Sequence, residues 1–278
     1  MTNTLWPVPS EWEKSLILWE QYLIACNKRP RTVETRIRAM RNFAREINEI
    51  PQNVTEDDIF SWAGRKQWAA ETRHSKYVTL RSFYEWYARK NELADPTLYL
   101  PSIHRACPPP RPIPEFLYEQ SLSDTNSRRT LLILRLAGNL GLRVDEICRA
   151  NIEDIMPDLL GYSLRVTGKG GVVRYLPLPT TMHRDLIAAA DPVTGFVFPG
   201  KINGHLSARW VGKIGAQALP GEWTLHTLRH RFGTISYRQD HDLLTVQRLL
   251  GHLQVSTTQR YVEPAKEAMR STILAISI

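Results

Sequence analysis

Residues 223–262 combine histidines and arginines in a segment that otherwise has the pattern of amphipathic helix. His226 and Arg229 are three positions apart, so a helix places both on one face, whereas His230 projects elsewhere. Guanidinium forks match the geometry of phosphate oxygens, and histidines can add hydrogen bonds, so the pattern predicts a phosphate-binding site. The alternative is a zinc pair of His226 and His230, but HExxH is absent and no carboxylate completes a triad.

A glycine, a histidine and a tyrosine follow the helical part of this segment. Gly251 is a natural helix end, His252 comes directly after it, and Tyr261 lies further on. A phenol has a pKa of about 10 and is inert as a nucleophile unless cationic groups surround it. The nearby arginines and histidines supply such groups, so we predict that Tyr261 attacks a bound phosphate. The competing interpretation is an ordinary core or surface tyrosine, and only the joint pattern favours chemistry.

Two residues upstream can complete a site that cleaves a phosphodiester. Such a site needs donors for the non-bridging oxygens and an acid for the departing oxygen, beside the nucleophile. Arg143 adds a guanidinium, and Lys169, in a glycine-bounded turn, can protonate a leaving 5′-oxygen. The plain alternatives are a helical ion pair of Arg143 with Glu146 and a solvated Gly-Lys-Gly-Gly turn. Nothing in this set requires a metal, because the acidic cluster that Mg²⁺ needs is absent, and we expect no cofactor.

The composition favours a polyanion as the partner. The chain has 278 residues, 42% of them hydrophobic, and a net charge of +8. This length is typical of about two domains. The positive charge favours nucleic acid as the partner. A membrane surface is the competing polyanion, but no terminus carries a basic amphipathic anchor. The longest apolar run, residues 131–142, is too short to span a bilayer, and residues 1–19 do not resemble a signal peptide. Three widely spaced cysteines indicate reduced thiols in a cytosolic protein.

Hydrophobic periodicity predicts two domains on either side of a proline-rich linker at residues 101–114. Helices are expected at 11–27, from an N-cap at Thr32, from an N-cap at Thr55 to 62, at 71–91, near 115, at 128–140, at 181–190 and 207–218, and within 223–262. Residues 141–146 are expected to turn the chain into another short helix. Alternation predicts a hairpin of strands at 162–167 and 172–178. The expected fold is mainly α with a small antiparallel β-sheet. Its domains would be an all-α region at 11–100, after a tail at 1–10, and an α+β region at 115–262, before a tail at 263–278.

In order and spacing these motifs resemble those of the tyrosine recombinases, the family of phage integrases and Xer-type site-specific recombinases. The likeness covers nearly the whole chain. The matching segments are GLRVDEI at 141–147, VTGKG at 166–170, YLPL at 175–178, HTLRH at 226–230 and LGH at 250–252, with Tyr261 at the family's customary distance beyond. Their common order argues against coincidence.

The resemblance implies a role for each matching residue. The six catalytic positions are Arg143, Lys169, His226, Arg229, His252 and Tyr261, with Tyr261 as nucleophile and Lys169 as general acid. Glu146 and His230 are implied to position the catalytic residues without contacting the phosphate themselves. The chain departs from the family at Asn139 and Asp145, beside the first arginine, and at His241, where a glycine is common. None of these departures removes a catalytic group.

The family's activity is site-specific recombination at double-stranded DNA sites. The resemblance implies a reaction through a 3′-phosphotyrosyl intermediate and a Holliday junction, which needs no ATP. It also implies that protomers, which are monomers in solution, form a homotetramer on DNA. Integration of a phage or mobile element is the expected role, in the cytoplasm of a bacterium or phage-infected host, with a directionality factor as a further candidate partner. The alternatives are Xer-type dimer resolution, a type IB topoisomerase-like role and, in another class, a catalytically silent DNA-binding regulator.

The region before the linker resembles the helical, SAM-like core-binding domain of the same family. By that similarity the two domains form a clamp around duplex DNA, with Arg36, Arg73 and Lys76 as candidate contacts; a solvated helix face is the alternative. About ten residues precede the first expected helix, which suggests a two-domain form without an arm-binding domain. The apolar end of the tail is expected to dock on a neighbouring protomer.

Overall fold

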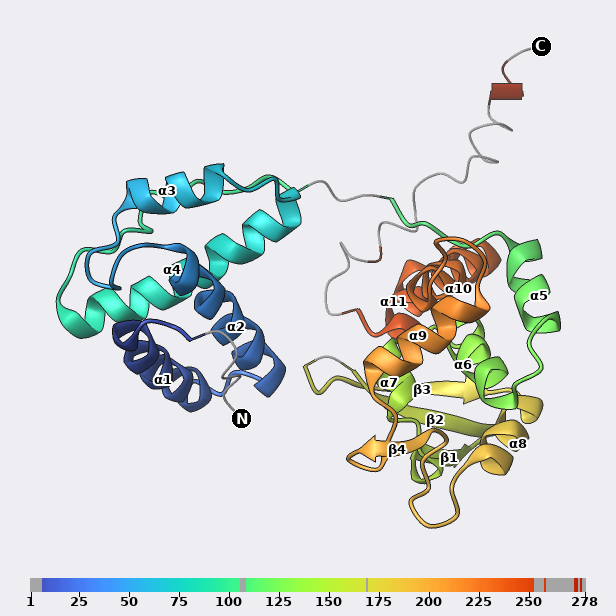
Figure 1. Ribbon diagram of the computed structural model, residues 1–278. Helices are drawn as coiled ribbons and strands as arrows, with labels where there is room; N and C mark the ends of the chain where they lie inside the picture. The colour runs from blue at the N-terminus through green and yellow to red at the C-terminus, as the bar shows by residue number, and fades with distance from the viewer. Residues whose placement is uncertain are drawn as a thin grey trace. The chain divides into compact units, whose positions relative to one another are not determined.

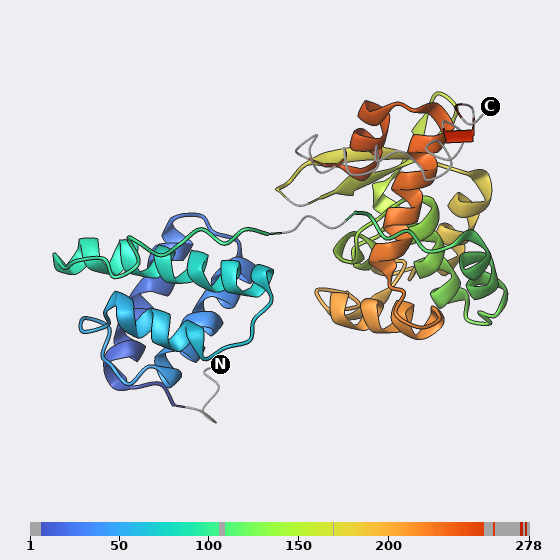
Figure 2. The same ribbon diagram turned by 90° about the horizontal axis from the view of Figure 1, so that it is seen from above.

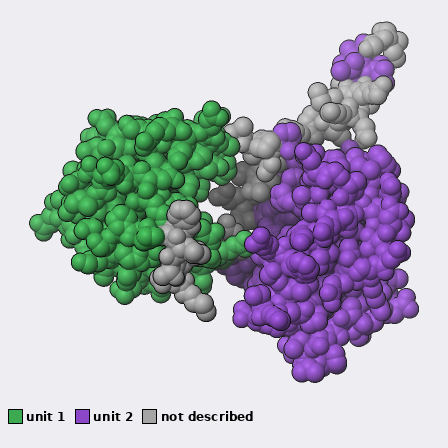
Figure 3. Space-filling view, in the orientation of Figure 1, with its two compact units in different colours: residues 1–107 green, residues 108–278 purple. Residues whose placement is uncertain are grey.

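The chain folds into two compact units, residues 1–107 and 108–278 (Figure 3). The computed structural model describes residues 7–105, 109–168, 170–252, 258, 273, 274 and 276. Each unit encloses its own hydrophobic core. None of the helices in these described ranges has the length and apolar character that a membrane span requires.

The first unit is built from helices, as the periodicity predicts. They are α1 (Ser10–Ala25), α2 (Pro30–Glu46), α3 (Glu56–Gly64) and α4 (Ala70–Asn91) (Figure 1). The predicted cap of α3 is confirmed, because Thr55 Oγ1 accepts a hydrogen bond from Asp58 N at 3.3 Å and Thr55 N donates to Asp58 Oδ2 at 2.9 Å. The predicted cap of α2 is wrong. Arg29 occupies that position instead, because Pro30, with its fixed φ and missing N–H, suits the first helical residue.

Aromatic rings in edge-to-face and stacked contacts fill the core of the first unit. Trp12 lies 5.7 Å from both Phe43 and Phe83, measured between ring centroids, and Phe43 lies 4.8 Å from Trp62. Such pairs add about 0.5–1.5 kcal/mol each beyond the area they bury. Because these rings come from α1, α2, α3 and α4, they fix the helices against one another.

The second unit combines helices with a small sheet. Its helices are α5 (Glu115–Ser123), α6 (Arg128–Asn139), α7 (Val144–Cys148), the 3₁₀ turn η1 (Ile152–Asp154), α8 (Thr180–Ala189), α9 (Ala208–Ala218), α10 (Leu225–Asp240) and α11 (Leu243–Leu250). Strands β1 (Ile155–Asp158), β2 (Gly161–Thr167) and β3 (Val173–Leu178) form an antiparallel sheet in that order, and β4 (Pro199–Ile202) lies apart from it. This confirms the mainly α fold with a small antiparallel sheet.

The apolar helix α6 lies at the centre of the second unit. It packs along α10 and also contacts α7, α8 and α9, and Figure 1 and Figure 2 both show it beside α10. The helix α11 packs on β3. After α6 the chain turns at Gly141, whose φ is +63°, and a Cβ there would lie 2.4 Å from Phe232 Cδ1 on α10. Only glycine therefore allows this turn, which carries the chain from α6 into α7 against α10.

His241 ends α10 in the left-handed conformation, with φ 53° and ψ 17°. We expect His241→Gly to raise the free energy of unfolding of the second unit by about 0.5–1 kcal/mol. The relieved strain of about 1–2 kcal/mol exceeds the added backbone entropy of glycine. Pulse proteolysis in urea, scored on fragments of the second unit, measures the change. Gln239→Gly, inside the helix, should lower stability by about 1 kcal/mol; a loss of stability in both variants would refute the strain at His241.

Candidate active site

Arg143 and Glu146 bind each other across the start of α7. Arg143 precedes the helix, and its Nη1 donates to Glu146 Oε1 at 2.9 Å. The backbone N–H of Arg143 donates to the other carboxylate oxygen, Oε2, at 2.8 Å. The sequence spacing allowed an ordinary helical ion pair, but Glu146 is only 5% exposed and has further partners. The pair therefore belongs to a buried network.

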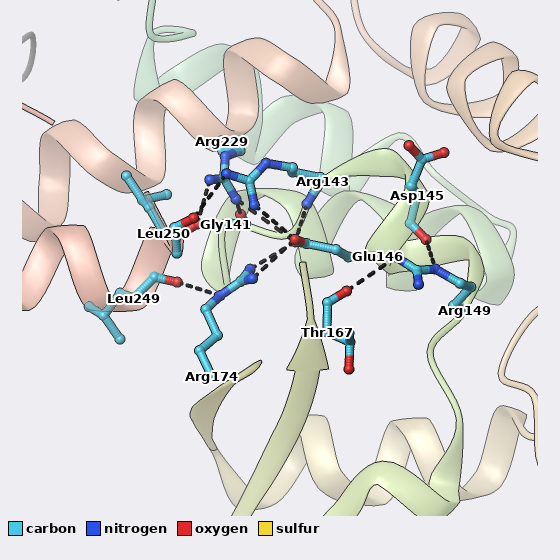
Figure 4. Close-up of polar contacts among 11 residues, drawn as sticks. Gly141, Arg143, Asp145, Glu146, Arg149, Thr167, Arg174, Arg229, Leu249 and Leu250 are labelled. Carbon is cyan, nitrogen blue, oxygen red and sulfur yellow. Dashed lines mark hydrogen bonds and ion pairs between the residues drawn. The ribbon is translucent and has the colours of Figure 1, made fainter. Parts of the chain in front are cut away.

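Three arginines surround the carboxylate of Glu146 (Figure 4). Arg174, on β3, donates from Nη1 to Oε1 at 3.0 Å and from Nη2 to Oε2 at 2.8 Å. The Nη1 atom of Arg229, on α10, lies 4.0 Å from Oε2. Arg174 and Arg229 are 7% and 3% exposed, whereas 32% of the Arg143 side chain is exposed. The cluster thus has one negative and three positive charges, and Arg143 is the arginine that reaches solvent.

The same three guanidinium groups bind the carbonyl oxygens at the end of α11. Arg174 Nε donates to Leu249 O at 2.8 Å, Arg229 Nη2 to Leu250 O at 2.6 Å and Arg143 Nη2 to Gly251 O at 3.3 Å. A helix leaves its last carbonyls without intrahelical partners, and cations are favoured there. These bonds fix three consecutive peptide groups immediately before the next residue, His252.

Arg229 also ties α10 to the turn after α6, because its Nη1 donates to Gly141 O. The turn, the α10 helix and the α11 end are therefore joined by one buried side chain. This is the contact that brings the GLR, HTLRH and LGH motifs of the sequence together in space.

Burial alone would raise the pKa of Glu146. The hydrogen bonds and charge of Arg174, together with the N–H and charge of Arg143, lower this pKa by more than burial raises it. The resulting pKa is about 2. The carboxylate is therefore ionised throughout the physiological range, and it holds the three arginines at fixed positions.

Acid should weaken the second unit through Glu146. Its pKa in the folded protein, about 2, lies below the ordinary value of 4.5. The stabilisation is therefore complete above pH 4.5 and is lost as the pH falls towards 2; it amounts to about 3 kcal/mol. We expect pulse proteolysis in urea to show this loss, and Glu146→Gln to have a shallower dependence between pH 5 and pH 3. Equal slopes for the two proteins would contradict the assignment.

The three histidines of the HTLRH and LGH motifs have further contacts. His252 Nδ1 shares a hydrogen bond of 2.9 Å with Thr258 Oγ1, and the Thr258 side chain is buried. His226, an exposed residue of α10, has its ring centroid 4.3 Å from that of His230. His230 Nδ1 accepts from Arg111 N at 3.0 Å, which ties α10 to the segment before α5. That bond agrees with the structural role expected for His230, although its part in the reaction stays a prediction.

The structure brings together Arg143, Arg229 and the backbone at His252, with Glu146 between the arginines. It places His226 one turn before Arg229 on the same helix. Lys169 and Tyr261 lie outside the described residues, as does most of the tail that was expected to dock on a neighbour. The catalytic assignments therefore remain predictions based on residue type and motif.

Sequence reasoning missed Arg174, although the strand pattern held a signal. Burial alternates along β3, and Arg174 shares the buried face with Leu176 and Leu178. A charged side chain is rarely buried without a partner. An arginine at an inward position of a strand therefore predicts a buried carboxylate, and Glu146 is the carboxylate that Arg174 binds.

The three candidate DNA contacts of the first unit have intramolecular partners. Arg36 Nη1 donates to Ser82 Oγ at 2.8 Å. Arg73 donates to the carbonyl oxygens of Ala63 and Lys66 at 3.1 and 3.0 Å, which ties α4 to the end of α3. Lys76 Nζ lies 5.9 Å from the centre of the Trp68 ring. All three residues are half-buried, and their role in DNA binding stays a prediction.

Known proteins share the sequence pattern that surrounds this site. Residues 114–268 match the phage integrase family. Tyrosine recombinase XerC of Bacillus pumilus is 31% identical over 230 residues, which cover 73% of this chain and 74% of the relative. Tyrosine recombinase XerD of Staphylococcus epidermidis is 32% identical over 212 residues, which cover 69% and 71%.

Solved recombinase structures share the fold. A XerH site-specific recombinase bound to a palindromic difH substrate has a TM-score of 0.70 at 17% identity, covering 89% of this chain and 80% of that one. A lambda integrase dimer bound to a COC′ core site has a TM-score of 0.69 at 18% identity, covering 90% and 76%. At these identities the likeness shows the fold alone. The family match and the identity to XerC and XerD confirm the resemblance: the chain is a tyrosine recombinase and belongs to the phage integrase family.

Proposed function

We propose that this recombinase cuts and rejoins double-stranded DNA at specific sites through Tyr261. The observation that carries the proposal is the arginine cluster around Glu146. Its three guanidinium groups have a net charge of +2 with the carboxylate, and they bind the peptide groups that lead directly into His252. A preformed cationic site of this kind suits a phosphate that gains negative charge as it reacts.

In the proposed cleavage step, the phenolic oxygen of Tyr261 attacks the scissile phosphorus. The new bond joins that oxygen to phosphorus, and the bond from phosphorus to the 5′-oxygen breaks. Lys169 supplies a proton to the departing 5′-oxygen, while the phenol gives its proton to water. A 5′-hydroxyl from the partner strand reverses the step and restores the phenol. The phosphotyrosine conserves the bond energy, so ATP is not needed.

Arg143, Arg229, His226 and His252 would donate hydrogen bonds to the non-bridging oxygens in the transition state. Removing one donor of this type from an enzyme typically lowers the rate about 10²–10³-fold. The exposed part of Arg143 is the most direct candidate for phosphate contact. Arg229, which is more deeply buried, would add its charge to its hydrogen bond and also sets the positions of Gly141 and Leu250.

DNA is the partner that the charge of the chain and its relatives support. The net charge is +8, and the XerH and lambda integrase structures contain their DNA sites. We propose that the first unit is the core-binding half of a clamp, that four protomers assemble on two sites through a Holliday junction, and that the protein acts in the cytoplasm. Integration of a phage or mobile element is the role we propose. Xer-type resolution is the second candidate, favoured by the identity to XerC and XerD.

A trapping experiment tests the chemistry and its specificity. Sheared DNA of the source is incubated with the protein in EDTA, and covalent adducts are sequenced. The DNA is nicked lightly, so that a short fragment released with a free 5′-hydroxyl can diffuse away and the adduct persists. A recombinase yields 3′-linked adducts at one class of site. In a parallel assay on a supercoiled plasmid, relaxation without sequence preference would indicate a topoisomerase-like enzyme. DNA binding without any adduct would indicate a regulator.

A further inference from the structure

Arg174 is a buried arginine of β3 that the six assigned catalytic positions do not include. Its guanidinium group binds both oxygens of Glu146 through two bonds of 3.0 and 2.8 Å, and its Nε binds Leu249 O at 2.8 Å. All the donors in these bonds are directed into the protein, and the residue is 7% exposed. Arg174 therefore cannot contact DNA directly, and any effect it has on the reaction passes through other residues.

The Arg174–Glu146 pair packs against the glycines that precede two catalytic positions. A Cβ on Gly251, just before His252, would lie 3.1 Å from both Cδ and Nη1 of Arg174. A Cβ on Gly168, just before Lys169 in the chain, would lie 3.2 Å from Glu146 Oε1 and 3.5 Å from Arg174 Nη1. The ion pair thus touches the backbone on both sides, at the hairpin turn and at the end of α11.

We propose that Arg174 is a positioning residue for DNA cleavage, which holds the Glu146 carboxylate in place and sets the backbone before His252. The inference rests on the proposed function, since it concerns the same cleavage step. Through Glu146 it acts on Arg143, whose N–H and Nη1 bind that carboxylate. Through Leu249 O it acts on the end of α11. One buried side chain would thereby align two parts of the phosphate site.

The charge balance around Glu146 explains why the loss of Arg174 would be felt at neutral pH. Burial is the largest influence on the carboxyl and raises its pKa, and Arg174 is the largest influence that lowers it. Without Arg174, the nearby charges that remain are Arg143 before α7 and Arg229 on α10. The cavity beside the carboxyl, about 280 Å³, is also lined by Arg149, Asp154 and Arg165. We therefore expect Glu146 to bind a proton at higher pH in the variant and to release Arg143.

The test compares cleavage rate, DNA affinity and pH dependence in matched variants. The substrate is a nicked duplex that carries the site mapped from wild-type adducts, and single-turnover adduct formation is followed from pH 5.5 to 8.5. Arg174→Gln should slow cleavage about 100-fold at pH 7, the cost of a small misplacement of reacting groups. As the pH is lowered, its rate should fall more steeply than the wild-type rate, because protonation of Glu146 adds to whatever pH dependence the wild type has. DNA affinity should change less than about threefold, as for a residue away from the interface.

Two further variants separate positioning from folding. Arg174→Lys keeps the charge but loses the bidentate fork and the Nε bond, so it should restore the wild-type pH dependence and only part of the rate. The double variant Arg174→Gln with Glu146→Gln has no carboxyl to titrate, so it should be slow at every pH. If Arg174→Gln does not fold, the neutral pair carries the test by comparison with Glu146→Gln alone, and a further loss of rate in the pair is the expected result.

Arg165→Gln is the matched control, since Arg165 lies on the neighbouring strand and its ion pair with Asp154 is exposed. It should keep the wild-type rate and pH dependence. The inference is overturned if Arg174→Gln cleaves at the wild-type rate, or if the neutral pair cleaves as fast as Glu146→Gln alone. It is also overturned if the slower rate only reflects a smaller folded fraction with an unchanged pH dependence. A wild-type protein that forms no adduct would instead refute the proposed function, and this inference with it.

Discussion

Replacing Tyr261 by phenylalanine is expected to abolish the covalent DNA adduct while DNA binding is retained. The substitution removes only the phenolic oxygen, so no bond to phosphorus can form. Loss of a nucleophile in a well-studied hydrolase lowers the rate on the order of 10⁶-fold, which is beyond detection in an adduct assay. Denaturing gels score the adduct, and mobility shifts under native conditions score DNA binding.

The control for this prediction is Tyr237→Phe, which removes a phenol from α10 in the same C-terminal segment. Its adduct yield should equal that of the wild type. An adduct of Tyr261→Phe at the wild-type level would show that another group attacks the phosphate. Loss of DNA binding in Tyr261→Phe would show that the phenol has a structural part instead.

Removal of the Glu146 carboxylate has the second large expected effect. We expect Glu146→Ala to lower the free energy of unfolding of the second unit by about 3–5 kcal/mol, because it leaves Arg174 and Arg229 buried without their common counter-charge. Pulse proteolysis in urea measures the change on fragments of this unit. Cleavage activity should fall as well, since Arg143 loses two of its bonds.

Asp154→Asn provides the comparison, because the ion pair of Asp154 with Arg165 is exposed and should contribute less than about 1 kcal/mol. A loss below 1 kcal/mol in Glu146→Ala would mean that water or a rearranged side chain replaces the carboxylate. That result would remove the basis for treating the three arginines as one fixed cluster.

Local sequence signals predicted the helices and the hairpin well, because caps and periodicity act over a few residues. Thr55 and Asp58 form the expected cap, and the predicted strands match β2 and β3 within one residue at each end. The sequence did not reveal β1, which is four residues long and contains Pro157. That strand exists because it pairs with β2, and a pairing partner cannot be read from so short a segment.

Motif spacing predicted which residues gather at the site but not how they are held. Arg229 binds Gly141 O, 88 residues away, and Arg143 binds Gly251 O, 108 residues away. Such contacts depend on the tertiary packing of α10 and α11, for which no local pattern exists. Arg174 escaped notice for the same reason: its partners Glu146 and Leu249 lie 28 and 75 residues away.

The cluster explains how a chain without DNA can keep a strongly cationic site assembled. Like charges repel, so three guanidinium groups need a carboxylate and carbonyl oxygens to remain close together. Glu146 and the end of α11 supply both. The arrangement is set before DNA arrives, so little reorganisation is required when the phosphate develops charge.

Mass spectrometry of the trapped adduct tests the central claim most directly. The wild-type protein is incubated with the nicked duplex, digested with trypsin and nuclease, and the peptide that retains a nucleotide is sequenced. We predict a single modified peptide with a nucleotide joined through its 3′-phosphate to Tyr261. A nucleotide on any other residue, or one joined through a 5′-phosphate, would contradict the account.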